Sequence, residues 1–356
     1  MSIRVLARTL RGLEDVAARE ITERGLGRVE LTRHREVWFT TDRPGARLLD
    51  LRTADDVFLL AAAVDGVGHT KPDLARVTEA ARTIAPRELL RLRGRCGGAG
   101  TATGVDVAAS FLGKRNYNRY DLEDTVGTEI ATALALPYHS RRGGSAPPEG
   151  TLSFRVTVED TRAALALRIG DRPLHRRDYK QASTPGTLHP PLAAAMALLA
   201  GIEPGHTVLD PCCGTGTLLI ETAHLVPGAR LLGADHDPRA LAAATGNATT
   251  ATATATEARW LRADAGRMPV GTGVVDRLVS NPPWERQVAG RGALAARPDR
   301  LYREIRRVLS PTGTAVLLLH DAQAQCAAAT AAGLRVRETR TLSLFGTHPS
   351  IVTLTG

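Results

Sequence analysis

The sequence predicts a mixed α/β protein whose C-terminal half is a mostly parallel sheet with helices on both faces. Two observations support this prediction. From about residue 190 onward, short apolar strands alternate with helical stretches, which is the pattern of a parallel sheet. Before that point, alternating strands and amphipathic helices follow one another less regularly, as in small α+β units. The 356 residues allow two or three such parts.

The composition is that of a globular protein. Hydrophobic residues make up 43% and charged residues 23%, which excludes global disorder. No stretch approaches the roughly 18 uninterrupted apolar residues that a membrane helix needs, and charges near the start argue against an export signal. The four cysteines show no metal-binding spacing, and two are adjacent, which disfavours a disulfide scaffold. We therefore expect a cytoplasmic monomer without a metal or a membrane partner.

The chain is strongly basic. Lys and Arg number 46 against 37 Asp and Glu, a net charge of +9 with a pI near 10.0. A basic domain suits polyanions, because phosphates that it neutralises release their counterions. An arginine-rich composition also arises from GC-rich codon usage, so charge alone leaves nucleic-acid binding open.

The N-terminal half is predicted to hold two α+β segments. Residues 1–68 are expected to form a strand, a helix, two strands and a second helix; the first four elements fall at 3–7, 13–24, 29–32 and 36–40. In residues 69–179 we expect helices at 74–84 and 122–134 and strands at 104–111, 152–158 and 163–169.

The C-terminal part, residues 180–356, is predicted to begin with a connector at 180–191. Strands are expected at 208–210, 231–235, 260–264, 276–281 and 314–319, with helices at 218–225, 240–244 and 299–309. The Ala- and Thr-rich run at 242–256 is interpreted as a surface helix and loop without function.

The stretch Val208-Leu-Asp-Pro-Cys-Cys-Gly-Thr-Gly-Thr-Leu-Leu-Ile-Glu221 is the strongest sign of a nucleotide-type ligand. A strand ending at Asp210 leads into a loop with Gly214 and Gly216, and a helix begins at Thr217. Glycines allow a ligand to approach the backbone closely, and the helix start offers unpaired N–H groups. The next strand ends in an acid, Asp235, which can hold ribose hydroxyls. The third ends at Asp264, placed to reach an adenine edge.

Two ligands compete for this layout. An NAD site favours GxGxxG, but Leu219 stands where the third glycine belongs, and Asp210 would repel a pyrophosphate. A ligand that carries an ammonium and a sulfonium instead of phosphates would be attracted to that acid. The sequence therefore favours S-adenosylmethionine.

A fourth strand is followed by Asn281-Pro282-Pro283-Trp284, which faces the same edge of the sheet. The prolines remove N–H donors and stiffen the local carbonyls, and Asn281 adds a side-chain oxygen. Two such acceptors can hold both hydrogens of an exocyclic amino group and aim its lone pair at a methyl donor. Trp284 can stack on a base taken out of its helix. An ordinary turn with a buried Trp is the competing interpretation of this motif.

With these motifs the sequence resembles class I methyltransferases that methylate amines, and more narrowly the THUMP-domain RNA guanine-N2-methyltransferases. The loop is similar to that family's Asp-Pro-x-Cys-Gly-Ser-Gly-Thr pattern. The stretches at 173–179 and 187–196 resemble its connector, 111–127 its THUMP core and 9–20 its preceding ferredoxin-like domain. The resemblance covers nearly the whole chain in family order.

The resemblance implies a ferredoxin-like domain at 1–68, a THUMP RNA-binding domain at 69–179 and a Rossmann-like methyltransferase domain at 180–356. The THUMP module would dock the acceptor-stem end of tRNA. Around the cofactor, the loop would hold the methionine part, Asp235 the ribose, and Asp264 with Ala265 the adenine. The implied cofactor-binding residues are Asp210, Cys212, Gly214, Thr215, Gly216, Thr217, Asp235, Asp264, Ala265 and Asn281.

The guanine would be held by the catalytic residues Asn281, Pro282, Pro283 and Trp284; relatives more often carry Tyr or Phe at the last position. The connector near residues 188–191 would close over the cofactor. The candidate RNA contacts are Lys114, Arg115, Arg119, Arg176 and Arg177. The basic residues Arg141, Arg142 and Arg172 are either phosphate contacts or part of a solvated surface. Cys212 is expected to be a packed small residue rather than a reactive thiol.

The function expected from these features is S-adenosylmethionine-dependent methylation of a guanosine N2 amine in tRNA. The same chemistry on 23S rRNA stays open, and so does methylation of adenine N6, because the motif alone does not separate the two amines. A catalytically silent RNA-binding or assembly protein is the alternative from another class, although the intact motifs argue against it. A DNA methyltransferase is disfavoured because the N-terminal half resembles an RNA-docking module.

Overall fold

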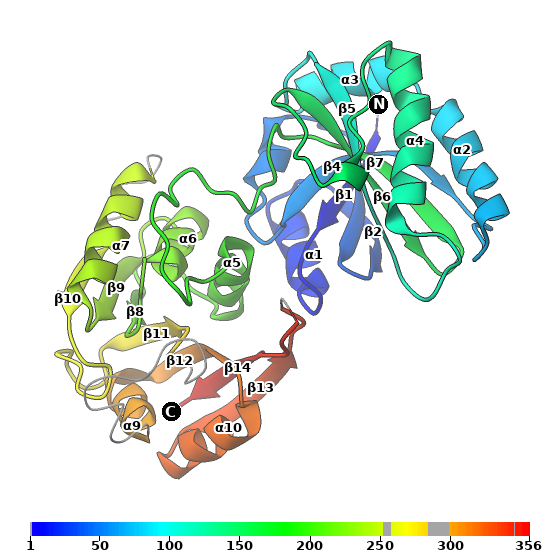
Figure 1. Ribbon diagram of the computed structural model, residues 1–356. Helices are drawn as coiled ribbons and strands as arrows, with labels where there is room; N and C mark the ends of the chain where they lie inside the picture. The colour runs from blue at the N-terminus through cyan, green and yellow to red at the C-terminus, as the bar shows by residue number, and fades with distance from the viewer. Residues whose placement is uncertain (1, 252–257, 284–298, 345) are drawn as a thin grey trace. The chain divides into compact units, whose positions relative to one another are not determined.

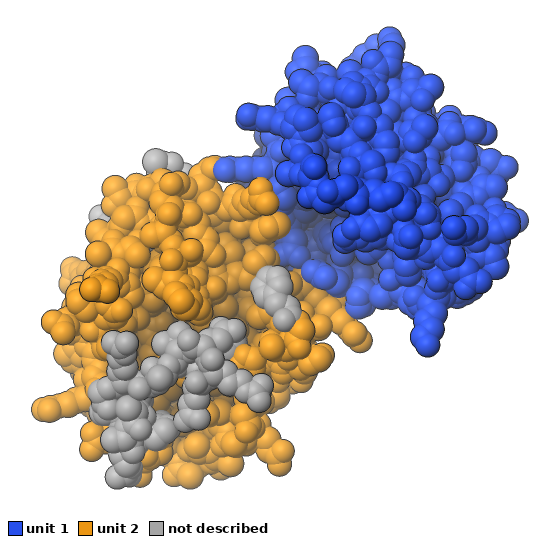
Figure 2. All heavy atoms as spheres, in the orientation of Figure 1, with its two compact units in different colours: residues 1–9, 17–174 blue, residues 10–16, 175–356 orange. Residues whose placement is uncertain are grey.

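A computed structural model describes residues 2–251, 258–283, 299–344 and 346–356 (Figure 1). The chain forms two compact units (Figure 2). Unit 1 comprises residues 1–9 and 17–174, and unit 2 comprises residues 10–16 and 175–356. Among the described residues, no helix is both long enough and apolar enough to cross a membrane.

Unit 1 is built on one seven-stranded sheet with the order β2-β3-β1-β4-β7-β6-β5. Its strands are β1 (Ile3–Arg8), β2 (Arg28–Arg33), β3 (Glu36–Thr41), β4 (Asp56–Val64), β5 (Gly104–Phe111), β6 (Thr151–Glu159) and β7 (Arg162–Arg168). The central β4 pairs antiparallel with both β1 and β7. The strands of the predicted ferredoxin-like and THUMP segments therefore share one sheet, and the division of these segments at residue 68 remains a prediction.

One face of this sheet is covered by helices. They are α1 (Glu14–Glu23), α2 (Leu74–Thr83), α3 (Pro86–Arg95) and α4 (Arg119–Leu134), with short 3-10 turns at Ala46–Asp50, Lys71–Asp73 and Arg141–Gly143. Alternate strand residues such as Leu59 and Leu167 pack beneath the helices. The opposite face carries a smaller apolar cluster around Trp38 and Phe58 and a charged pair, Arg168–Asp56 at 2.6 Å.

The sequence prediction was wrong at one element of this unit and incomplete at another. The second helix expected in residues 1–68 is instead the short 3-10 turn followed by strand β4. A central strand buried on both faces is a continuous apolar run, which periodicity does not distinguish from a buried helix segment. Helix α3 was not predicted, because its sequence is mostly polar and its buried residues include Arg93.

Unit 2 is built on a second seven-stranded sheet, with the order β10-β9-β8-β11-β12-β14-β13. Its strands are β8 (Thr207–Asp210), β9 (Arg230–Asp235), β10 (Arg259–Arg262), β11 (Val275–Ser280), β12 (Leu309–Leu319), β13 (Arg335–Thr341) and β14 (Ser350–Thr355). The first five pair in parallel, and β14 is antiparallel to its two neighbours. The predicted parallel α/β sheet is confirmed.

Helices cover both faces of this sheet (Figure 1). They are α5 (Pro190–Leu199), α6 (Thr217–Leu225) and α7 (Pro238–Thr250) on one face, and α9 (Asp299–Val308) and α10 (Ala322–Ala331) on the other. The chain runs outward from β8 to β9 and β10, then returns to β11 on the other side of β8. Ligands in such sheets bind at the carboxyl ends of the strands where the order reverses. We therefore expect the ligand site of this protein at the carboxyl ends of β8 and β11.

The turn from β8 into α6 depends on a glycine. Gly216 caps the helix with a φ of +81°, a conformation that side chains rarely adopt. A Cβ atom there would lie 2.8 Å from the Trp260 ring and 3.1 Å from the Ala244 Cβ. The glycine therefore lets α6 and the loop approach β10 and α7 closely.

Replacing this glycine should destabilise the protein. Gly216→Ala adds both backbone strain and a steric overlap with Trp260, so we expect a loss of about 1–3 kcal/mol in the free energy of unfolding. Gly246→Ala is the matched control, because this glycine lies in α7 and, among the described residues outside its own helix backbone, no atom lies within 4 Å of the added Cβ. This variant should gain up to about 1 kcal/mol in the free energy of unfolding. Urea unfolding measures both, and equal stability of the two variants would contradict the assignment.

Candidate functional site

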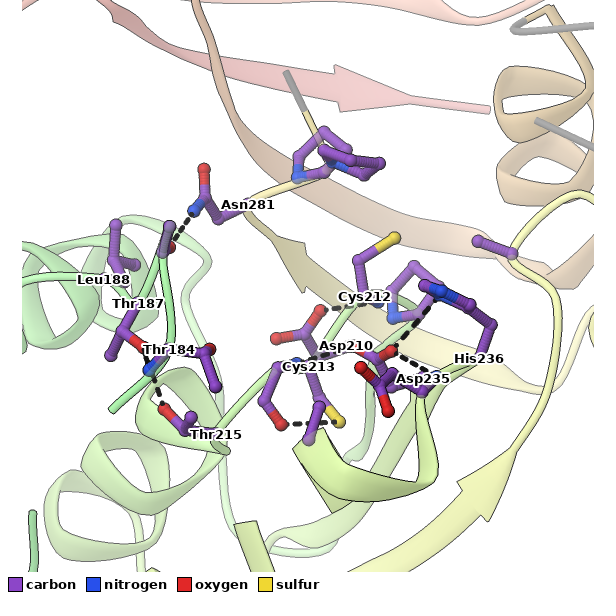
Figure 3. A pocket seen from close by; sticks show the side chains of 18 of the residues that line it. Thr184, Thr187, Leu188, Asp210, Cys212, Cys213, Thr215, Asp235, His236 and Asn281 are labelled. Atoms are coloured by element: carbon purple, nitrogen blue, oxygen red, sulfur yellow. Dashed lines mark hydrogen bonds and ion pairs between the residues drawn. The ribbon is translucent and has the colours of Figure 1, made fainter. Parts of the chain in front are cut away.

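A cavity of about 560 Å³ opens at the carboxyl ends of β8, β9, β10 and β11, which is a size typical of small-molecule sites. Figure 3 shows many of its side chains. The predicted residues that line it are Asp210, Cys212, Gly214, Thr215, Thr217, Asp235, Asp264, Ala265, Asn281, Pro282 and Pro283. Gly216 is not among the lining residues, and its contribution is the conformation of the turn. Trp284 lies outside the described residues.

Asp210 lies at the centre of this edge and is almost fully buried, with 1% of its surface exposed. Its Oδ1 accepts hydrogen bonds from the Ser280 hydroxyl at 2.8 Å and from the Cys212 N–H at 3.1 Å. Burial, with a smaller contribution from the nearby Asp235 carboxylate, raises the pKa of Asp210 to about 7. The ionised carboxyl group is therefore held at an energetic cost, which a cation in the cavity would relieve.

Asp235 holds the glycine loop in place. One carboxylate oxygen, Oδ2, accepts a hydrogen bond from the Gly214 N–H at 2.9 Å, and Oδ1 accepts one from the Asp237 N–H at 2.9 Å. The His236 ring nitrogen lies 3.4 Å from Oδ1. Each carboxylate oxygen can accept more than one bond, so the group both organises the loop and keeps acceptor capacity toward the cavity.

The third acid lies slightly beyond the end of its strand. β10 ends at Arg262, so Asp264 stands two residues past the strand rather than at its last position as predicted. Its Oδ1 accepts a hydrogen bond from the Gly266 N–H at 2.8 Å, and both Asp264 and Ala265 line the cavity. The strand is shorter because the chain turns through a bridge between Asp264 and Arg267.

Asn281 follows directly on β11. Its Nδ2 donates a hydrogen bond to the Gly186 carbonyl at 3.2 Å, and Oδ1 is turned away from that carbonyl (Figure 3). Oδ1 is buried, and it has no hydrogen-bond partner in the part of the chain that the structure describes. A buried acceptor without a partner costs free energy, so this oxygen is suited to receive a donor from a bound molecule.

The connector contributes more of the cavity wall than the sequence indicated. Residues 188–191 were expected there, whereas residues 184–188 line the cavity, and 189–191 are not among the lining residues. His236, Asp237, Arg239 and Cys213 were also missed. The run Thr184-Pro-Gly-Thr187 carries a turn signal, but no sequence pattern indicates which surface a turn covers. The sequence signal that could have indicated His236 is its position directly after Asp235, the acid at the end of β9.

The connector is fixed to the helices below it by buried polar groups. Glu221 on α6 is fully buried and accepts hydrogen bonds from Arg177 Nε at 3.1 Å and from the Tyr179 hydroxyl at 2.8 Å. Asn247 on α7 is also fully buried and binds the connector at Gln181 and Ala182. The run at 242–256, interpreted as a surface segment without function, thus contains a structural residue.

The adjacent cysteines carry neutral thiols. Burial, together with the Asp210 and Asp235 carboxylates, raises the pKa of Cys212 and of Cys213 well above the usual value. Neutral thiols are poor nucleophiles. Cys212 is half-buried and lines the cavity, so its role as a packed residue stays a prediction.

The candidate RNA contacts occupy different environments. Lys114, Arg119 and Arg176 are exposed, and the Arg119 guanidinium lies 4.6 Å from the centre of the Tyr120 ring. Arg115 donates hydrogen bonds to the carbonyls of Gly68 and Asp160 and to the Tyr117 hydroxyl. The Arg177 side chain is buried against Glu221.

Two further arginines are paired within unit 1. Arg141 binds the fully buried Asp106 through two hydrogen bonds of 2.6 Å, and Arg142 pairs with Asp121 and Asp124.

Comparison with known proteins places the cavity in a methyltransferase domain. Residues 177–350 match the family described as RMKL-like, methyltransferase domain. The tRNA (guanine(6)-N2)-methyltransferase of Thermus thermophilus is 31% identical over 252 residues, which cover 70% of this chain and 71% of that protein. A protein of the same name from Archaeoglobus fulgidus is 23% identical over 97% of this chain and 90% of its own length.

Solved structures match along the whole length. TrmN from Thermus thermophilus matches with a TM-score of 0.78 and 27% identity, covering 99% of each chain. SMU.472, which was solved in complex with SAH, matches with a TM-score of 0.71 and 17% identity, covering 100% of this chain and 98% of that one. The second likeness is one of fold.

The raised pKa of Asp210 predicts a pH-dependent stability. The folded state binds the proton of the Asp210 carboxyl more tightly than the unfolded chain does. Protonation of this group therefore stabilises the fold fully below about pH 4, and the stabilisation is lost as the pH rises toward 7. Asp210→Asn keeps an oxygen acceptor for Ser280 and removes the titration. The unfolding free energy of wild type relative to this variant should fall from pH 4 to 7 and then level off. A difference that does not change with pH would show that burial leaves this carboxyl unperturbed.

Proposed function

We infer that this chain, which belongs to the family of RNA guanine-N2-methyltransferases, transfers a methyl group from S-adenosylmethionine. The acceptor that we propose is the exocyclic N2 amine of a guanosine in tRNA. The observation that carries the proposal is the meeting of Asp210, Asp235 and Asn281 in one cavity at the switch point of the sheet. The tRNA substrate is suggested by the names of the Thermus and Archaeoglobus relatives.

The cavity fits the cofactor by its donor set. S-adenosylmethionine supplies an electrophilic methyl group on a sulfonium. Burial favours the neutral form of the Asp210 carboxyl. The cationic end of the cofactor would shift this group toward its ionised form, which then offers a counter-charge. Asp235 keeps acceptor capacity for ribose hydroxyls. Asp264 and Ala265 lie at the far strand, where the adenine edge would be recognised. A pyrophosphate would find two carboxylates at this position, which argues against a dinucleotide.

Asn281 is proposed to bind the guanine amine through Oδ1, and the Pro282 carbonyl is proposed as the second acceptor. The amine nitrogen is a weak nucleophile because its lone pair is delocalised into the ring. S-adenosylmethionine held by Asp210 and Asp235 would supply the methyl group to this nitrogen and would leave as the neutral thioether, and the methylated amine would release its extra proton to water. Asn281 does not titrate, so it would act by stabilising the positive charge that develops on nitrogen. Trp284 is proposed to stack on the base.

Unit 1 is proposed to dock the tRNA near its acceptor-stem end through the predicted THUMP segment. The exposed Lys114 and Arg119, with Arg176 in unit 2, are the proposed phosphate contacts. Arg115 and Arg177 are proposed to act indirectly, since their guanidinium groups bind neighbouring protein atoms.

The substrate assignment is tested by deleting the gene in its host and complementing the deletion. Mass spectrometry of nucleosides from separated tRNA and rRNA should show N2-methylguanosine lost from tRNA and restored by the wild-type gene. The Asn281→Ala gene should not restore it. Loss from rRNA instead would move the proposal to the ribosomal substrate, loss of N6-methyladenosine would move it to adenine, and no loss would favour a silent RNA-binding protein.

The role of Asn281 is tested by kinetics. Asn281→Ala removes one preorganised acceptor and should lower kcat by about 10²–10³, with little change in cofactor affinity measured by calorimetry. Asn281→Asp keeps an acceptor oxygen and should retain more activity than the alanine variant. A single-turnover rate equal to wild type in Asn281→Ala, with N2 confirmed as the product site, would rule this mechanism out.

A further inference from the structure

The orientation of the Asn281 amide is set by the connector. An asparagine amide presents a donor and an acceptor of nearly the same shape, so a half-turn of the group exchanges them. Only the acceptor end can bind an amine hydrogen. The Gly186 carbonyl can only accept, and it receives Nδ2 at 3.2 Å. This contact keeps Oδ1 free for the amine.

The Gly186 carbonyl is itself placed by a short turn. The Thr184 N–H donates to the Thr187 hydroxyl at 2.8 Å, and the Thr187 N–H donates back to the Thr184 carbonyl at 3.0 Å. Gly186 has a φ of +81°, which the turn requires. The position of the turn then depends on what anchors the segment just before it.

That anchor is Asn247. Its Oδ1 accepts hydrogen bonds from the N–H groups of Gln181 and Ala182 at 3.1 and 3.0 Å. Its Nδ2 donates to the carbonyls of Ala182 and Thr215 at 3.1 Å each. The side chain is fully buried, and all four bonds reach backbone atoms, so one amide joins the connector, the cofactor loop and α7. Buried networks satisfied in this way hold a single geometry.

We propose that Asn247 is a positioning residue for the methyl transfer, which acts through residues 181–186 to hold the Asn281 amide with its acceptor toward the substrate. This inference rests on the proposed function. Asn247 lines no part of the cavity, so its influence on the reaction passes through the connector. When it is removed, the connector loses its anchor, and the Gly186 carbonyl no longer fixes the Asn281 amide.

The grip on the connector is tested without an activity assay. The peptide bond between Lys180 and Gln181 is a tryptic site whose N–H is held by Asn247. Native-state trypsin digestion should cut there at least several-fold faster in Asn247→Ala than in wild type. Thr249→Ala is the matched control on the exposed side of α7 and should be cut at the wild-type rate. Equal cleavage in all three proteins would overturn the inference.

Transmission to Asn281 is tested by a double-mutant cycle on single-turnover methylation with saturating cofactor and tRNA. A small misplacement of reacting groups costs up to about 10² in rate, so Asn247→Ala should lower the rate by about 10- to 100-fold. In an Asn281→Ala background, the same substitution should lower the rate by less than about 3-fold, because its target is already gone. Thr249→Ala should leave both rates unchanged.

The outcomes separate the inference from the proposed function. Losses that multiply in the double variant mean a general structural role and overturn the inference alone. A wild-type protein that methylates no guanosine overturns the proposed function and the inference with it. If Asn247→Ala does not fold, Asn247→Asp takes its place. It keeps the acceptor for Gln181 and Ala182 but replaces the donor with an oxygen that faces the Ala182 and Thr215 carbonyls. Its rate loss should likewise vanish beside Asn281→Ala.

Discussion

The buried hydrogen bond between Asp210 and Ser280 is the constraint on which the site depends. It joins the carboxyl ends of two neighbouring parallel strands, β8 and β11, at the point where the strand order reverses. The glycine loop begins directly after the first strand, and Asn281 directly after the second. One bond of 2.8 Å therefore fixes the group proposed to face the cofactor relative to the group proposed to bind the acceptor amine. In-line transfer requires this kind of fixed separation.

The same carboxyl group links stability to function. It is held almost without solvent, and a second carboxylate lies nearby, so its ionised form is costly in the folded protein. A ligand that brings positive charge into the cavity would offset the free-energy cost of ionising this carboxyl group, and a phosphate-bearing ligand would increase that cost. The preference for S-adenosylmethionine over a dinucleotide thus follows from the burial and the charge of this carboxyl group, in addition to the glycine pattern of the loop.

Arginine serves the scaffold as much as the surface in this protein. Arg141 binds the buried Asp106 on β5. Arg115 binds backbone carbonyls of two segments, at residues 67–68 and at Asp160. Arg177 forms a buried pair with Glu221. Removing one partner of a buried pair is costly because the other is left uncompensated. Net charge therefore overstates the surface available to a polyanion, and the exposed Lys114 and Arg119 are better measures of it.

The sequence by itself determined the parallel strands of the C-terminal sheet, the loop after β8, and three acids of which two end a strand and the third follows one closely. Strand and helix periodicity, glycine and proline act over a few neighbouring residues, so these features could be predicted. The tertiary structure decided what depends on partners far along the chain. Strand β4 looked helical because both its faces are buried. Asn247 sat in a low-complexity run and gained its role only when the connector, 65 residues earlier, came to lie against it. Arg115 and Arg177 were predicted as RNA contacts because they are basic. In the folded protein, their guanidinium groups instead bind protein oxygen atoms that the fold brings within reach.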